Sequence, residues 1–141
     1  MYCSVSAATP TPASLAQIFA VAQRNNLRDG ITSVLLVDGR LLIQFIEGPE
    51  PSVQALWARI CNDPQHHCIV QLLLHNGATQ RLFGSWPMLH GQATRAEMLA
   101  LVRNAYLSSS TAQRPVWAQS IGPLMILLDG EFSHAFADPP P

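Results

Sequence analysis

Two apolar segments separated by a pair of turn residues limit the choice of folds more than anything else in the chain. Residues 31–37 and 40–47 are rich in aliphatic side chains, and Asp38-Gly39 lies between them. An Asp-Gly pair between two apolar runs predicts a β-hairpin, because both residues tolerate the backbone angles of a tight turn. Both arms are apolar at successive positions, so we expect each strand to be covered on both faces.

An amphipathic helix is predicted on each side of this hairpin. The first begins at Pro12, after the capping residue Thr11, and ends before Gly30, and the second begins at Pro51 and ends at residues 62–64. Shorter strands are predicted near residues 1–6, 67–74 and 85–89. This order is typical of an α+β, ferredoxin-like βαββαββ sheet with the two helices on one face.

A third helix is predicted after this unit. Thr94 and Glu97 have the spacing of a capping box. The apolar stripe that follows consists of Met98, Leu101, Val102, Ala105 and Tyr106. Because the first two helices occupy one face of the sheet, we expect this helix on the opposite face. Residues 1–92 are therefore predicted to form the main domain and residues 93–141 a C-terminal helical extension, in which the apolar run 124–128 is an extra strand or a docking segment.

Composition narrows the classes of function. The chain has 141 residues, of which 48% are hydrophobic and 12% charged, as expected for one globular domain. A formal net charge of −1 offers no basic surface for nucleic acid or an anionic membrane. No apolar run reaches the roughly 18 residues that a membrane helix needs, and the first residues lack the order of a signal peptide. We therefore expect a cytoplasmic protein.

Catalytic and metal-binding patterns are missing from the sequence. It contains no phosphate-binding glycine loop, serine-hydrolase motif or zinc-protease motif, and its carboxylates are too scattered for a catalytic pair. Cys61, His66, His67 and Cys68 match no zinc spacing, and adjacent strand residues point to opposite faces. We expect neither an enzyme nor a metal site.

Polar side chains at apolar positions are the best candidates for a binding site. Gln44 falls on the buried face of an alternating strand, Asn25 and Asn26 end the apolar stripe of the first helix, and Tyr2 places a phenol in a central strand. Each has a structural alternative: a satisfied core amide, helix-capping asparagines and a core tyrosine. Together, one phenol and three amides facing one space suit a flat heteroaromatic ligand.

Five motifs between residues 2 and 88 occur together at intervals found in one known family. They are Tyr2 with Ser4, Arg24-Asn25-Asn26-x-Arg28-Asp29-Gly30-Ile31-Thr32, Gln44-Phe45-Ile46-Glu47-Gly48-Pro49, Asp63-x-x-His66 and Arg81-x-Phe83-x-x-Trp86-x-Met88. The chain thereby resembles the blue-light-using-flavin (BLUF) photoreceptor domains, in a short single-domain form. No insertion interrupts the family's spacing from Tyr2 to His66.

The resemblance implies a cofactor and the residues that hold it. FAD would bind between the two helices, with Asn26 hydrogen-bonding the carbonyl and imide edge of the ring. Asn25 and Arg28 would assist, Gln44 would contact the flavin, and His66 would form part of the flavin-side wall.

The resemblance also implies a signalling mechanism. Tyr2 and Gln44 would form the photoactive pair, in which light draws an electron and a proton from the phenol and the hydrogen bonds of the amide rearrange. Trp86 and Met88, on the last strand, would relay the change to the C-terminal extension. The output would be contact with an unidentified protein partner, with self-association as a further role of that surface. The alternative is a flavin-free or photo-inactive ferredoxin-like interaction module.

Three features depart from the family pattern. Only Met1 precedes Tyr2, where the family normally has several residues. Ser33 stands where a glycine usually follows the threonine, which places a side chain in a crowded strand. Gln65 replaces the basic residue usual before His66, which weakens the expected hold on the phosphates of the cofactor.

Overall fold

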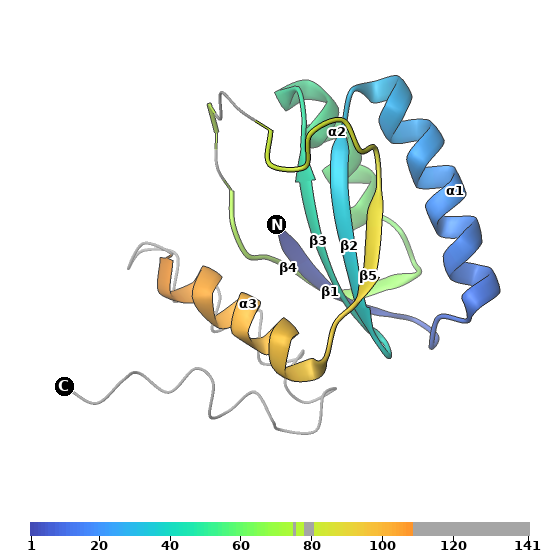
Figure 1. Ribbon diagram of the computed structural model, residues 1–141, viewed down its shortest axis with the longest axis vertical. Helices are drawn as coiled ribbons and strands as arrows, with labels where there is room; N and C mark the ends of the chain where they lie inside the picture. The colour runs from blue at the N-terminus through green and yellow to red at the C-terminus, as the bar shows by residue number, and fades with distance from the viewer. Residues whose placement is uncertain (75, 78–80, 109–141) are drawn as a thin grey trace.

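A computed structural model describes residues 1–74, 76–77 and 81–108 of the chain. Its elements are β1 (Tyr2–Ser6), α1 (Pro12–Asp29), β2 (Thr32–Asp38), β3 (Leu41–Glu47), α2 (Glu50–Cys61), β4 (His66–Gln71), β5 (Leu89–Gln92) and α3 (Arg95–Ser108). The sheet has the order β4-β1-β3-β2-β5, in which β2 and β5 are parallel and the other neighbours antiparallel. Helices α1 and α2 lie on one side of the sheet and α3 on the other (Figure 1). The predicted α+β, ferredoxin-like arrangement is confirmed.

The hairpin forms where the sequence predicts it. Asp38 pairs with Leu41 at the last rung of β2 and β3, and Gly39 in the turn has a φ of 55°, in the left-handed region that glycine adopts without strain. Burial is less uniform than expected. The first four residues of β3 are buried, whereas its last three are only partly covered.

The two helices on the first face contribute few fully buried side chains. Thr11 caps α1 as predicted, accepting a hydrogen bond from the backbone of Ser14 at 3.1 Å. Within α1 only Asn26 is buried, and within α2 only Ile60. Near the C-terminal end of α1, the side chain that faces the sheet is therefore the amide of Asn26 and not an apolar group. This amide lies between the sheet and the helices.

Helix α3 covers the opposite face, as predicted. Thr94 and Glu97 form the expected capping box, with the Thr94 backbone donating to the Glu97 carboxylate at 2.8 Å. Met98 and Val102 are fully buried. They pack in one cluster with Cys3, Val5, Leu41, Ile43, Val70 and Leu72. The predicted contacts of Ala105 and Tyr106 and the apolar run 124–128 fall outside the part of the chain whose side chains are described.

Met98→Ala tests this packing. We expect the free energy of unfolding to fall by about 2–5 kcal/mol, because the substitution leaves a cavity among fully buried side chains. Urea unfolding followed by circular dichroism measures it. Arg103→Ala, an exposed substitution on the same helix, should change stability by less than about 0.5 kcal/mol. Equal losses in the two variants would contradict the placement of α3.

The last strand begins later than expected. The sequence predicts it over residues 85–89, but β5 begins at Leu89, so Trp86 and Met88 lie in the segment before it. Pro87 has no N–H to give to a ladder. The N–H groups of Leu82 and Phe83 are bound to a side chain, the Glu47 carboxylate. The segment therefore crosses the ends of β3 and β2 as a loop before it joins the sheet (Figure 1).

Candidate functional site

Tyr2 and Gln44 are brought together by strand register. They lie directly opposite each other on β1 and β3, and the Tyr2 hydroxyl donates a 2.5 Å hydrogen bond to Gln44 Oε1. Both side chains are buried, and the tyrosine ring packs on Trp57 with ring centroids 5.4 Å apart. Burial, reinforced by the negative charge of Asp63, raises the pKa of Tyr2 far above its ordinary value. The phenol therefore stays protonated and fixes the carbonyl end of the amide.

The other end of the Gln44 amide has an incomplete set of partners. Its Nε2 lies 3.8 Å from the sulphur of Met88, and no other described residue accepts a hydrogen bond from it. One N–H of a buried amide thus remains unpaired within the described part of the chain. Such a group costs about 1–3 kcal/mol unless something binds it.

Asn26 presents the complementary atom. Its Nδ2 donates to Ser33 Oγ at 3.0 Å and to the Pro87 carbonyl at 2.8 Å, whereas its Oδ1 accepts no hydrogen bond from any described residue. The left-handed residue Gly30 caps the helix, so the Asn26 side chain is not the helix cap that the structural alternative predicts. A buried acceptor and a buried donor are left for a ligand. They fit the imide N–H and carbonyl groups along one edge of a flavin ring.

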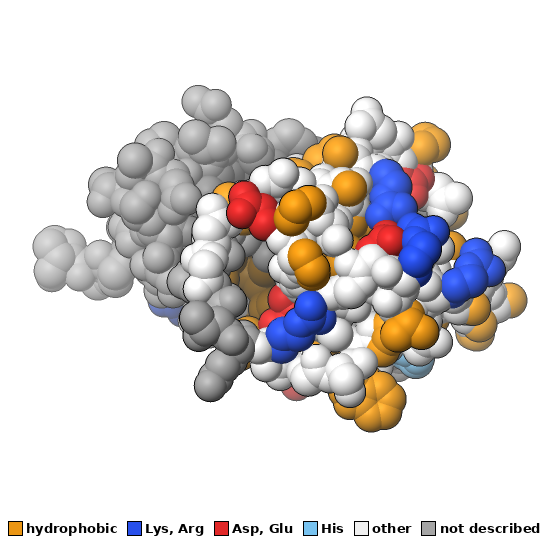
Figure 2. All heavy atoms as spheres, turned by 90° about the horizontal axis from the view of Figure 1, so that it is seen from above, with side chains coloured by type: hydrophobic (Ala, Val, Ile, Leu, Met, Phe, Trp, Pro, Cys, Tyr) orange, Lys and Arg blue, Asp and Glu red, His pale blue; other side chains and the backbone are white. Residues whose placement is uncertain are grey.

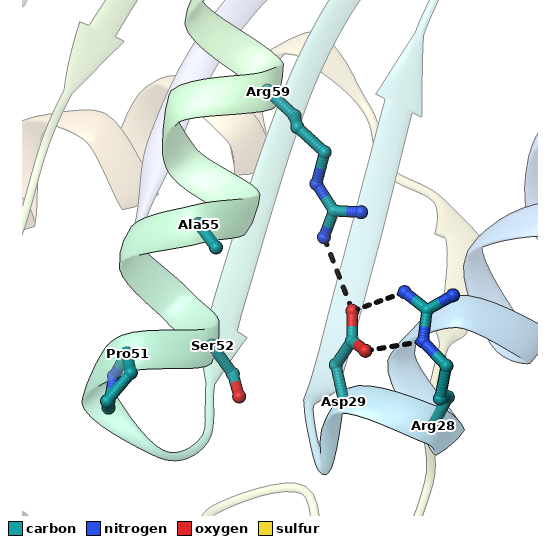
Figure 3. Close-up of a pocket in the computed structure, with 6 residues that line it drawn as sticks. All are labelled: Arg28, Asp29, Pro51, Ser52, Ala55 and Arg59. Carbon is teal, nitrogen blue, oxygen red and sulfur yellow. Dashed lines mark hydrogen bonds and ion pairs between the residues drawn. The ribbon is translucent and has the colours of Figure 1, made fainter.

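A pocket of about 530 Å³ lies between α1 and α2 (Figure 3). It is lined by Arg28, Asp29, Pro51, Ser52, Ala55 and Arg59. Arg28 pairs with Asp29 at 2.7 Å, and Arg59 approaches the same carboxylate at 3.4 Å. Two positive charges around one negative charge leave this pocket basic, but the pairs are exposed and contribute little stability. Tyr2 and Gln44 are not among its lining residues.

His66 pairs with Ser6 at the far end of β1 from Tyr2, and its side chain lies on the same face of the sheet as Ser4. Its Nδ1 is 2.9 Å from the hydroxyl of Ser4, which stands two residues after Tyr2 on β1 and is fully buried. Burial lowers the pKa of His66 despite the nearby charge of Asp63, which favours a neutral ring. Asn25, the remaining predicted residue, is half-buried near the end of α1.

Glu47 is a structural residue for which the sequence analysis assigns no role. Its carboxylate accepts hydrogen bonds from the backbones of Leu82 and Phe83 at 2.8 Å each and from the Thr32 hydroxyl at 2.9 Å. Burial raises the pKa of Glu47, but these donors and the charge of Arg81 outweigh it and hold the pKa below its ordinary value. Glu47 thereby ties the segment before β5 to the end of β3. Its place in the family motif at residues 44–49 is the only sequence signal for it.

Trp86 and Met88 have opposite environments. Met88 is 3% exposed and packs with Leu35 and Leu42 on the face of the sheet that α1 covers, whereas Trp86 is 61% exposed. The surface seen from above in Figure 2 has arginine side chains next to acidic ones, with hydrophobic side chains between them. Of the predicted relay pair, only Met88 touches the buried site.

Comparison with known proteins identifies the family. The family model described as sensors of blue light using FAD (BLUF) matches residues 1–89. The chain belongs to the BLUF family. The blue light- and temperature-regulated antirepressor BluF of Escherichia coli is 38% identical over 68 residues, which make up 48% of this chain and 17% of that protein.

Solved structures of light-responsive proteins share the fold. The dark-state structure of the BLUF protein BlrB superposes with a TM-score of 0.60 at 31% identity and covers 87% of this chain and 92% of its own. A bacterial light-regulated adenylyl cyclase superposes with a TM-score of 0.64 at 26% identity, over 91% of this chain and 34% of that one. The chain thus spans only a minor part of the antirepressor and of the cyclase.

No helix in the described ranges is long and apolar enough to cross a membrane. Among the same residues, no group of three or more His, Cys, Asp or Glu side chains is placed to hold a metal ion.

Proposed function

We propose that this protein is a blue-light photoreceptor that binds FAD and signals by rearranging the hydrogen bonds of Gln44. The observation that carries the proposal is a buried series of hydrogen bonds, from the Tyr2 hydroxyl to the Gln44 amide and from that amide to the Met88 sulphur. One N–H of the same amide has no partner among the described residues, and the BLUF family to which the chain belongs uses FAD, which could accept this hydrogen bond.

Each residue of this series has chemistry suited to the switch. Flavin, when bound, would supply blue-light absorption and an excited state that accepts an electron. Tyr2 can release an electron and a proton together, because its phenol is protonated and hydrogen-bonded at 2.5 Å. Gln44 carries an acceptor and two donors on one rotatable group, so a change at the phenol can reverse which end of the amide faces its neighbours.

The cofactor would be held at two places. Asn26 Oδ1 and the spare Gln44 N–H would bind the polar edge of the ring, with Asn25 and His66 beside them. Arg28 would face the phosphates at the pocket between the helices, where it now pairs with Asp29. The Arg28 side chain is 65% exposed in this ion pair, so the guanidinium can exchange Asp29 for a phosphate at little cost.

The signal would leave through the segment before β5. Met88 contacts the switch, and the same segment is bound six residues earlier to Glu47 at the end of β3. On the other face, α3 packs against β1, β3 and β4. We propose that residues 93–141 form the output region and that its partner is another protein.

A flavin-free interaction module is the second candidate. The Tyr2–Gln44 bond and the contacts of Asn26 Nδ2 satisfy much of the buried polar surface without a ligand. This reading predicts a colourless protein with no response to light.

Absorption spectroscopy of protein purified in darkness distinguishes the two candidates. We expect a yellow protein that releases non-covalent FAD on denaturation and shows a reversible spectral shift under blue light. Chromatography of the released flavin separates FAD from FMN. A colourless preparation that takes up no added flavin would contradict the proposal, and bound flavin without a light-induced shift would contradict the switch.

A further inference from the structure

Ser33 occupies the centre of a contact network that links α1 to the segment before β5. It is 0% exposed, on the face of β2 that looks toward α1. Its Oγ lies 3.0 Å from Asn26 Nδ2, 3.1 Å from the Pro87 carbonyl oxygen and 2.9 Å from the Met88 sulphur. A single hydroxyl therefore touches the proposed flavin anchor and the proposed relay residue.

The proton count decides how these contacts are used. Asn26 Nδ2 has two hydrogens, one directed to Ser33 Oγ and one to the Pro87 carbonyl. Ser33 has one proton to donate and two acceptors within reach: the second lone pair of the Pro87 carbonyl at 3.1 Å and the Met88 sulphur at 2.9 Å. The Ser33 hydroxyl is therefore bound to the segment before β5 through either acceptor, and the Met88 sulphur is the nearer of the two.

Met88 is held more closely by Ser33 than by Gln44. The Ser33 oxygen is 2.9 Å from the sulphur, whereas Gln44 Nε2 is 3.8 Å from it. Its backbone carbonyl also accepts a 3.4 Å hydrogen bond from the Gln23 side chain. Ser33 is thus the nearest polar partner of the Met88 sulphur, in addition to the packing of this side chain against Leu35 and Leu42.

We infer that Ser33 is a positioning residue of the photoreceptor: its hydroxyl couples Asn26 to Met88 and limits how often the segment before β5 moves away from α1 and β2. The inference rests on the proposed function for the roles of Asn26 and Met88. The contact between Ser33 and Met88 involves only protein atoms, so its main test needs no flavin.

The first measurement is made on flavin-free protein. In Ser33→Ala we expect amide exchange at residues 88–91 to accelerate roughly three- to tenfold, the range for loss of one buried neutral hydrogen bond. The methyl resonance of Met88, assigned by its loss in Met88→Leu, should move. Ser33→Gly, which removes the β-carbon as well, should show the same direction of change and serves if the alanine variant folds poorly.

A matched control and a double-mutant cycle separate positioning from general destabilisation. Ser4→Ala removes another fully buried serine hydroxyl from the same face, one that bonds His66 and not Met88. It should leave the Met88 resonance and the exchange at 88–91 unchanged. In a Met88→Leu background, Ser33→Ala should accelerate exchange by less than about twofold, because the coupled partner is gone.

The results distinguish failure of this inference from failure of the proposed function. An unmoved Met88 resonance with unchanged exchange in Ser33→Ala, or equal effects in both backgrounds, would overturn the inference even if wild type responds to light. In flavin-loaded protein, Ser33→Ala should keep the light-induced spectral shift, because Tyr2 and Gln44 are intact. Loss of that shift would assign Ser33 to the switch itself and would also overturn the inference.

Discussion

Gln44→Ala is expected to retain flavin and to lose the light-induced spectral shift completely. The amide is the only described group that contacts both the Tyr2 hydroxyl and the Met88 sulphur. Alanine leaves the phenol without its acceptor and leaves no group that can exchange a donor for an acceptor. Asn26, the proposed anchor of the ring, is untouched by the substitution. The measurement is the difference spectrum before and after blue light.

Two further variants make this result specific. Gln54→Ala removes an exposed glutamine of α2 that bonds Glu50, and it should keep a normal shift. Tyr2→Phe keeps the amide but removes its hydroxyl donor, and it should be silent as well. A normal shift in Gln44→Ala would place the switch elsewhere. Loss of flavin from that variant would show that Asn26 cannot hold the ring without the Gln44 contact.

The burial of the two central amides of this site can be predicted from the local sequence pattern. Alternation along residues 41–46 is enough to put Gln44 on a buried face, and the apolar stripe of α1 leads directly to Asn26. The sequence does not give the register of β1 against β3, which joins residues 42 positions apart. Family spacing predicted that Tyr2 and Gln44 act together, and the sheet places them on one rung.

The segment before β5 could not be predicted in the same way. Its geometry depends on side chains that accept backbone N–H groups, as Glu47 does, and on a proline that cannot join a ladder. Such contacts leave no periodic pattern in the sequence. For this reason the sequence predicts β5 too early, and the contacts of Ser33 with Asn26 and Met88 become apparent only in three dimensions.

Glu47→Gln is expected to loosen the segment before β5 and to remove one source of acid sensitivity. The carboxylate binds two backbone N–H groups and a hydroxyl, and a neutral amide has only one oxygen to replace it. We expect the free energy of unfolding at neutral pH to fall by about 1–3 kcal/mol. Amide exchange at Leu82 and Phe83 should accelerate by roughly tenfold or more in the same variant.

The sign of the pH dependence follows from the pKa of Glu47, which lies below its ordinary value in the folded state. A carboxyl of this kind stabilises the fold above its unfolded pKa and loses that contribution as pH falls through the folded pKa. The stability difference between wild type and Glu47→Gln should therefore be largest at neutral pH and vanish in acid. Urea unfolding across this range measures it. Glu50→Gln, the same change at an exposed carboxylate, should leave exchange at Leu82 and Phe83 unaltered. A difference independent of pH would show that the charge of Glu47 does not hold the segment.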